Sequence, residues 1–516
     1  MTKLKLTAII FLFLGWVAPE ATAQRSLGVY TFDHLPQSQI LNPGKPTPYR
    51  WYLGLPGLSS IDITAQSTAF SLYDIFGTDV NLDEELPKII SNLDQSDRVY
   101  VAQTVEILNL GFKTGSFYWS MGAYQSSMNN YQIPSTLFRL AYYGNASDEF
   151  FEKEVQVEDM NQFMLGYNTY HLGVQKNFLD DKLTVGIRGK YYVGIYNLQT
   201  TRFDMSIYSG IDEIRFTNDI LIQTAGATDF IQGNSINTEE LLLDYAFGPN
   251  NGIGFDIGAN YMIQDNWSVS ASVTDIGSIS WNENLLNYTS KGEFTWDGFE
   301  FDATDGSSSG FDYVGDSLAE AFNFEESEGT PYKTTMPMTF AASTEYMLHP
   351  KHGFGLVYRG TAIPNGEMYN DYSIVYMGKW ARWINFNVSY NMLNDTQGNL
   401  GAGVSLRAGA VQFTVMTDNV FGLTNPYEAR SSSILFGLNL SFWDFSKGHY
   451  ARGEETPNTT IPQAIPEAAP AEENPEGGLN EELEGTETET EKEEGEKEGV
   501  ETEETPETEN GIKNPK

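Results

Sequence analysis

The sequence predicts an all-β protein, a closed antiparallel transmembrane β-barrel of about fourteen strands. Several segments alternate apolar and polar residues over roughly 9–13 positions, the length that a tilted membrane-spanning strand requires. The chain holds 29 Tyr, 31 Phe and 48 Gly in 516 residues and no Cys. This composition favours strands with one apolar face over the Leu- and Ala-rich helices of many soluble enzymes.

The alternation is clearest in residues 183–195, where odd positions are mostly apolar and even positions mostly polar. A soluble β-sandwich also uses alternating strands, but its strands usually run only ~5–6 residues. Aromatic residues also gather at the ends of the segments, as expected for the girdles at the two membrane interfaces. These residues are Tyr118, Trp119, Trp281, Trp380, Trp383 and Trp443. Length and aromatic ends therefore favour the barrel.

In a membrane barrel the apolar face of a strand contacts lipid and the polar face lines the lumen. The residues expected to face lipid are Val185, Ile187, Val193, Phe255, Ile257, Val269, Val273, Phe386, Val388, Phe436 and Leu438. The residues expected to line the lumen are Arg188, Lys190, Asp256, Asn260, Asn385, Asn387 and Asn439.

Other candidate strands share this pattern and are separated by short turns such as Asp265-Asn266. They are 105–112, 116–125, 162–176, 201–209, 214–223, 253–263, 267–274, 293–301, 335–347, 353–359, 372–380, 384–390, 398–406, 411–417 and 434–442. Two segments instead have helical spacing, 82–93 and 316–322, and are expected in loops or in a plug.

The N-terminus has the pattern of a secretory signal peptide, residues 1–23. Lys3 and Lys5 precede an apolar run at 6–17, and Ala21-Thr22-Ala23 forms a cleavage site before Gln24. The run of about a dozen residues is shorter than the ~20 that span a bilayer. Residues 24–50 are expected to form a periplasmic or plug segment, and residues 51–445 the barrel.

The last segment, residues 446–516, differs sharply in composition. Residues 454–516 contain 21 Glu, 4 Lys, seven Pro and no aromatic residue. Such a segment cannot bury enough apolar surface to fold, so we expect it to be disordered. Two roles stay open: a solubilising spacer, or a periplasmic tail that binds a basic protein partner or divalent cations.

The sequence shows no catalytic constellation, so an enzyme, a cofactor and a metal site are not expected. The 70 acidic residues against 30 basic ones argue against nucleic acid as a partner. Gly306–Gly310 matches G-x-S-x-G, but it lies in a loop without the strand that a nucleophile elbow needs. His349 and His352 flank a Pro-Lys turn rather than a metal-binding helix.

Asn42-Pro43 and the run Tyr52–Ser60 resemble the N-terminal signature of an outer-membrane barrel family of the Bacteroidetes group that has no assigned activity. Further matching pieces are 183–197, 270–281, 332–337, 399–403 and 411–419, so the resemblance spans roughly residues 26–445. It implies plug or structural roles for Asn42, Pro43, Asp275, Trp281 and Pro337. The family is similar in style to FadL-type transporters of hydrophobic compounds and to barrel proteins of type IX secretion.

Two functions remain. The first is passive transport of a small or hydrophobic compound across the outer membrane, and the second is docking of a surface or secretion partner. A lumen plugged by residues 24–50 with a lateral gap would favour transport, whereas a sealed lumen with large ordered external loops would favour docking. Because an even number of strands returns the chain to one side, both termini are expected in the periplasm.

Overall fold

The computed structural model describes residues 26–32, 34–71, 73–74, 80–157, 160–211, 213–226, 246–296, 324–364, 368–381, 383–394 and 396–443. All of them belong to one compact unit, Met1–Pro457. The predicted signal peptide, the helix at 316–322, the Gly306–Gly310 motif and the acidic tail lie outside the described residues. Within the described ranges, no helix is long and apolar enough to cross a membrane.

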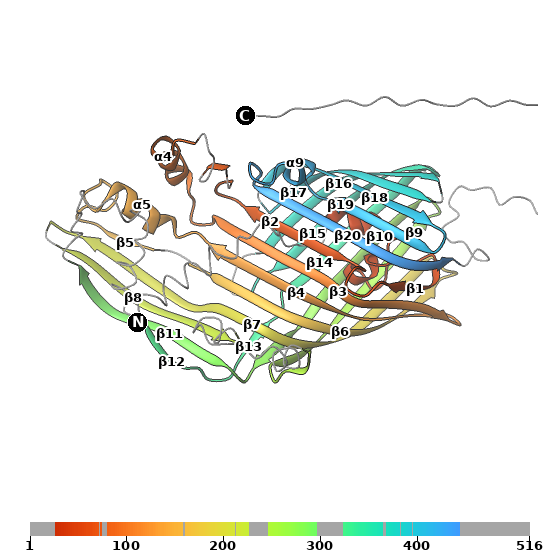
Figure 1. Ribbon diagram of the computed structural model, residues 1–516, viewed down its shortest axis with the longest axis horizontal. Coiled ribbons are helices and arrows are strands. Elements are labelled where there is room, and N and C mark those ends of the chain that lie inside the picture. Colours follow the sequence, from red (N-terminus) through yellow and green to blue (C-terminus); the bar gives the residue numbers. More distant parts are fainter. Residues whose placement is uncertain are drawn as a thin grey trace, which may run out of the picture. The chain divides into compact units, whose positions relative to one another are not determined.

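Fourteen antiparallel strands close into a ring, which confirms the predicted fold class (Figure 1). The order is β1 (Tyr49–Gly54) with β2 (Ile61–Ser67), β3 (Arg98–Thr114), β4 (Phe117–Gln132), β6 (Gln162–Phe178), β7 (Leu183–Ser209), β9 (Asn251–Gln264), β10 (Trp267–Trp281), β13 (Tyr332–Thr335) with β14 (Met338–His349), β15 (His352–Ala362), β16 (Met368–Ala381), β17 (Ile384–Leu393), β18 (Thr396–Ala408), β19 (Val411–Thr417) and β20 (Ser431–Trp443).

The first strand of the ring is broken into two halves. Both β1 and β2 pair with β3 on one side and with β20 on the other, and Tyr49 opposite Trp443 closes the ring. Residues 55–60 form a loop between the halves. Leu438 holds this loop in place by accepting a hydrogen bond from the Leu55 amide and donating one to the Leu58 carbonyl. None of the predicted segments corresponds to this strand, because each half is short.

Strand β7 is longer than the membrane-spanning part requires. The segments 183–195 and 201–209, predicted as two strands, form one strand of 27 residues. Its first part pairs with β9 as far as Val193, and from Asn197 onward it pairs with β8 (Ile214–Ala225). The prediction of separate ring strands at 201–209, 214–223 and 293–301 is therefore wrong.

Those segments build an extension of the sheet, which we call the lobe. It consists of β7 from Asn197 onward, β8, β11 (Leu285–Trp296), β12 (Glu325–Glu328), β5 (Glu154–Gln156) and the helix α5 (Ser135–Tyr143). An apolar cluster joins α5 to the sheet through residues such as Leu137, Ile207 and Phe216. The lobe lies at one end of the strands in Figure 1.

Short helices complete the described part. The predicted helix at 82–93 is confirmed as α4 (Leu82–Asn92). The others are η1 (Leu27–Thr31), α2 (Ser38–Leu41) and α9 (Val420–Thr424).

Burial along the ring strands is the reverse of that in a soluble protein. Apolar side chains such as Ile187, Phe255 and Ile374 are exposed, whereas polar neighbours on the same strands are buried. Exposed apolar side chains on a closed barrel are the surface that lipid solvates.

Three expectations about the outer face are wrong. Val193 is fully buried, because both faces of β7 are covered from Tyr192 to Ile195 where the strand passes toward the lobe. Trp281 and Tyr118 are buried rather than placed in a girdle, and Trp281 packs in an apolar cluster with Ile279. Trp380 and Trp383, in contrast, are more than half exposed.

Candidate functional site: the filled lumen

Residues 26–47, which we call the interior segment, occupy the inside of the ring (Figure 1, red). Nearly all of its described residues are buried. Two apolar clusters surround it, one with Leu27 and Tyr30 against β14 to β17 and one with Val29, Phe32 and Leu35 against β19 and β20. The described residues of the segment form no β-pairing with the wall, so contacts that involve side chains hold it in place.

Polar side chains from many strands anchor this segment. The Ser26 hydroxyl donates to Oδ1 of Asp418 at 2.6 Å, and the Leu27 amide donates to the same oxygen at 3.1 Å. Burial raises the pKa of Asp418, which follows the last residue of β19, although these hydrogen bonds act in the opposite direction. At the other end of the segment, Lys45 forms a buried ion pair with Glu345 of β14.

Gln37 is the anchor in the middle of the segment. Its Nε2 donates to Oε2 of Glu106 at 2.9 Å and to Oδ1 of Asn439 at 3.1 Å, joining β3 and β20. Asn387, on β17, donates to the Gly28 carbonyl at 3.1 Å. Of the residues expected to line the lumen, Asn387 and Asn439 therefore contact the interior segment.

The Asn42-Pro43 pair lies against glycines of the wall. Oδ1 of Asn42 accepts the Gly44 amide at 2.8 Å, and its Nδ2 donates to the Ala259 carbonyl at 3.3 Å. A Cβ atom at Gly186 would lie 1.9 Å from the Pro43 carbonyl oxygen, and one at Gly258 would lie 2.1 Å from Oδ1 of Asn42. Position 186 therefore needs glycine because the Pro43 backbone lies against it, whereas the atom nearest to position 258 belongs to the Asn42 side chain.

Arg188, Lys190 and Asp256 come together in one buried ionic cluster with Asp275. Nη1 of Arg188 lies 3.2 Å from Oδ2 of Asp256, and Nζ of Lys190 lies 2.9 Å from Asp256 and 2.7 Å from Asp275. Arg188 also donates to the carbonyls of Gln39 and Ile40. The cluster thus joins β7, β9, β10 and the interior segment.

The remaining predicted positions have smaller roles. Asn260 is buried and Asn385 half-buried, and neither hydrogen-bonds to the interior segment in the described part of the chain. Trp281 donates from Nε1 to the Thr334 hydroxyl at 3.0 Å. No local pattern in the sequence marks the anchors Gln37, Lys45 and Asp418 or the buried pair of Arg359 with Asp371, 2.7 Å apart. Arg359 and Glu345 lie in predicted strands, so alternation alone could have placed them inside.

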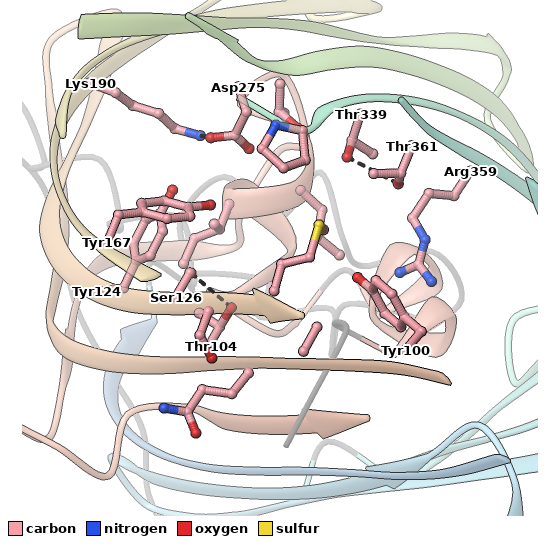
Figure 2. Close-up of a pocket in the computed structure, with 18 of the residues that line it drawn as sticks. Tyr100, Thr104, Tyr124, Ser126, Tyr167, Lys190, Asp275, Thr339, Arg359 and Thr361 are labelled. Carbon is pink, nitrogen blue, oxygen red and sulfur yellow. Dashed lines mark hydrogen bonds and ion pairs between the residues drawn. The ribbon is translucent and has the colours of Figure 1, made fainter. Parts of the chain in front are cut away.

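A cavity remains between the interior segment and the wall (Figure 2). Its volume is about 120 Å³, which is room for several waters. Tyr30, Ile40 and Leu41 of the interior segment line it, as does Pro337. Strands contribute Tyr100, Tyr167, Lys190, Asp275 and Arg359, several of which Figure 2 shows around the open space.

Residues 43–418 match the family of unknown function DUF5723. The chain belongs to this family. A comparison of the DUF5723 chain with curated proteins finds no match.

Solved barrels resemble this DUF5723 chain over most of their length. The P. putida toluene transporter TodX has 8% identity and a TM-score of 0.35, covering 80% of this chain and 94% of that one. The monoaromatic hydrocarbon channel CymD has 12% identity, a TM-score of 0.35 and the same coverage. A Pseudomonas aeruginosa FadL homologue has 9% identity and a TM-score of 0.35, covering 79% and 94%.

Proposed function

We propose that this chain is an outer-membrane barrel that passes a small compound, and that the interior segment is its movable plug. The observation that carries the proposal is the attachment of residues 26–47. They fill the ring without joining its strands, so they can move while every strand pairing stays intact. The cavity beside the segment supplies a place where a compound can stop on its way.

The exposed apolar band supports the membrane location. Side chains such as Ile187, Ile257 and Ile374 would be costly to leave in water but are favourable in lipid. The predicted signal peptide would deliver the chain to the periplasm. Tyr49, the first residue of β1, pairs with Trp443, the last residue of β20, so the barrel begins and ends at the same rim. Under this proposal that rim faces the periplasm.

Uptake by proteoliposomes tests the transport proposal. Vesicles with the wild type should swell in small neutral solutes and exclude larger ones. Deleting residues 26–47 should remove this size limit, because the interior segment then no longer occupies the lumen. If the deletion variant folds and both proteins leave the vesicles impermeable, transport through the lumen is contradicted.

The ordered lobe favours a second candidate, docking of a partner. One face of its sheet carries an exposed ionic network in which Asp219 bridges Arg202 at 2.6 Å and Lys291 at 2.6 Å. Under the docking proposal, Arg202→Glu with Lys291→Glu should abolish crosslinking to a partner in intact cells and leave vesicle swelling unchanged. If this double variant loses vesicle swelling and keeps its crosslinks, the docking proposal is contradicted and the transport proposal is favoured.

For the acidic tail we propose the spacer role. A C-terminal epitope tag should be labelled only after the outer membrane is permeabilised, and a chain lacking residues 454–516 should insert and swell vesicles normally. Labelling on intact cells would contradict the proposed topology. Loss of a specific protein on truncation would support the binding role instead.

A further inference from the structure

The cavity combines paired charges, aromatic walls and a carboxylate oxygen that accepts no hydrogen bond from the described residues. Resting on the transport function proposed above, we infer that the cavity binds a neutral monocyclic compound that carries hydroxyl groups, of the phenol type. A hydroxyl of the ligand donates to Asp275, and the ligand's ring packs between tyrosine side chains and apolar residues of the interior segment. Figure 2 labels Asp275 and the tyrosines Tyr100, Tyr124 and Tyr167 around the cavity.

The charges argue for a neutral ligand. Lys190 is paired with Asp256 and Asp275, Arg188 with Asp256, and Arg359 with Asp371. The three cations are thus balanced by three carboxylates. An ionic ligand would either enter without a counter-charge or break one of these buried pairs, and both are costly in a desolvated site.

Asp275 supplies the polar contact. It lies at a bulge of β10 with a φ of 60°, a left-handed conformation that a non-glycine residue adopts at a cost. Its Oδ1 accepts from Lys190 at 2.7 Å and from the Tyr192 hydroxyl at 3.0 Å. Its Oδ2 accepts no hydrogen bond from a described residue, and Asp275 lines the cavity. A ligand hydroxyl is the donor that this oxygen lacks.

The walls fit a flat ring. Tyr100 packs edge-on against Tyr369 at 5.5 Å, and Tyr167 packs edge-on against Tyr192 at 5.8 Å, so both cavity-lining rings are held in place. Ile40 and Leu41 add an apolar side. Fixed aromatic faces and apolar side chains bind an aromatic ring better than they bind a polyol, each of whose hydroxyls needs its own partner.

The hydroxyl pairs along the cavity also suit a hydroxylated ligand. Thr104 and Ser126 lie 3.0 Å apart, and Thr339 and Thr361 lie 3.2 Å apart. Each hydroxyl can rotate to donate or accept. They can therefore serve a second hydroxyl on the ring without introducing charge.

Calorimetry with the purified full chain tests this inference. Resorcinol, with eight heavy atoms and two hydroxyls, should bind, whereas 1,3-dimethoxybenzene, which cannot donate, should bind about tenfold or more weakly. Toluene and the anion 3-hydroxybenzoate should also bind more weakly than resorcinol. Because these comparisons change only the probe, they hold even if a variant fails to fold.

Variants locate the contact. Asp275→Asn should weaken resorcinol binding about tenfold or more, and asparagine tolerates a positive φ well. The matched control Asp219→Asn, in the lobe, should bind resorcinol as the wild type does. Failure of resorcinol to bind, equal binding of the dimethyl ether, or unchanged binding by a folded Asp275→Asn variant would overturn the inference.

Vesicle uptake separates this inference from the transport proposal. Resorcinol binding without protein-dependent uptake of any solute would support the ligand class and contradict transport. Uptake of neutral solutes without resorcinol binding would overturn the ligand class and leave transport standing.

Discussion

Arg188 and Asp256 are register partners on neighbouring strands β7 and β9, and Nη1 of Arg188 lies 3.2 Å from Oδ2 of Asp256. Both side chains are fully buried. Because Arg188 also donates to the Gln39 and Ile40 carbonyls, this one side chain links the wall to the interior segment. The same buried ion pair therefore stabilises the wall of the barrel and the position of the interior segment.

Removing Arg188 should destabilise the barrel strongly. Arg188→Met removes one of the two cations paired with Asp256 and leaves two carbonyls of the interior segment without this donor, so we expect a loss of about 3 kcal/mol or more in the free energy of unfolding. Urea unfolding in lipid vesicles measures it. The control Lys291→Met removes an exposed pair and should cost less than about 1 kcal/mol. Equal losses would contradict the role given to Arg188.

The outer face of β16 should be sensitive to charge. Ile374 is 54% exposed near the middle of the strand, so Ile374→Lys should cost about 2–4 kcal/mol in lipid vesicles. Ile211, beside the lobe, is 76% exposed, and Ile211→Lys should cost close to nothing because water solvates the charge there. If the two variants are equally stable in lipid, the band that includes Ile374 does not face the membrane.

Trp281 should behave as a core residue rather than as a membrane anchor. Its side chain is fully buried and donates a hydrogen bond to Thr334. Trp281→Ala should therefore lower the free energy of unfolding by about 3–5 kcal/mol. Trp380→Ala, at an exposed site, should cost much less. Brominated lipids provide a second measurement: they should quench a chain that retains only Trp380 and spare one that retains only Trp281. Strong quenching of Trp281 would contradict its buried position and support a place at the membrane interface.

Alternation predicted the ring well because it records which face of a strand meets lipid. It grouped Arg188 and Lys190 with Asp256 before any contact was known, and these three side chains form one cluster. The same pattern could not separate ring from lobe, since the strand segment 214–223 also has one covered face. Nor could it show that β7 continues through residues 196–200, because β-bulges at Ile195 and Thr201 interrupt the alternation on either side of them.

The contacts of the interior segment were beyond sequence reasoning for a different reason. Lys45 with Glu345, and Ser26 with Asp418, join residues that lie hundreds of positions apart. No local pattern relates such partners, and only closure of the ring brings them together. Residues 24–50 could therefore be predicted as a plug or periplasmic segment, but not attached to particular strands.

Movement of the interior segment is the central claim, and a reversible disulfide tests it most directly. A Cβ atom at Gly258 would lie 3.0 Å from Cγ of Asn42, close enough for Asn42→Cys with Gly258→Cys to bond, and the chain has no other cysteine. The measurement is uptake of small neutral solutes by vesicles that contain the double variant, with the two single variants as controls. Oxidation should abolish the uptake of the double variant alone, and reduction should restore it. Equal uptake by the fully oxidised and the reduced double variant would contradict the claim that the segment moves.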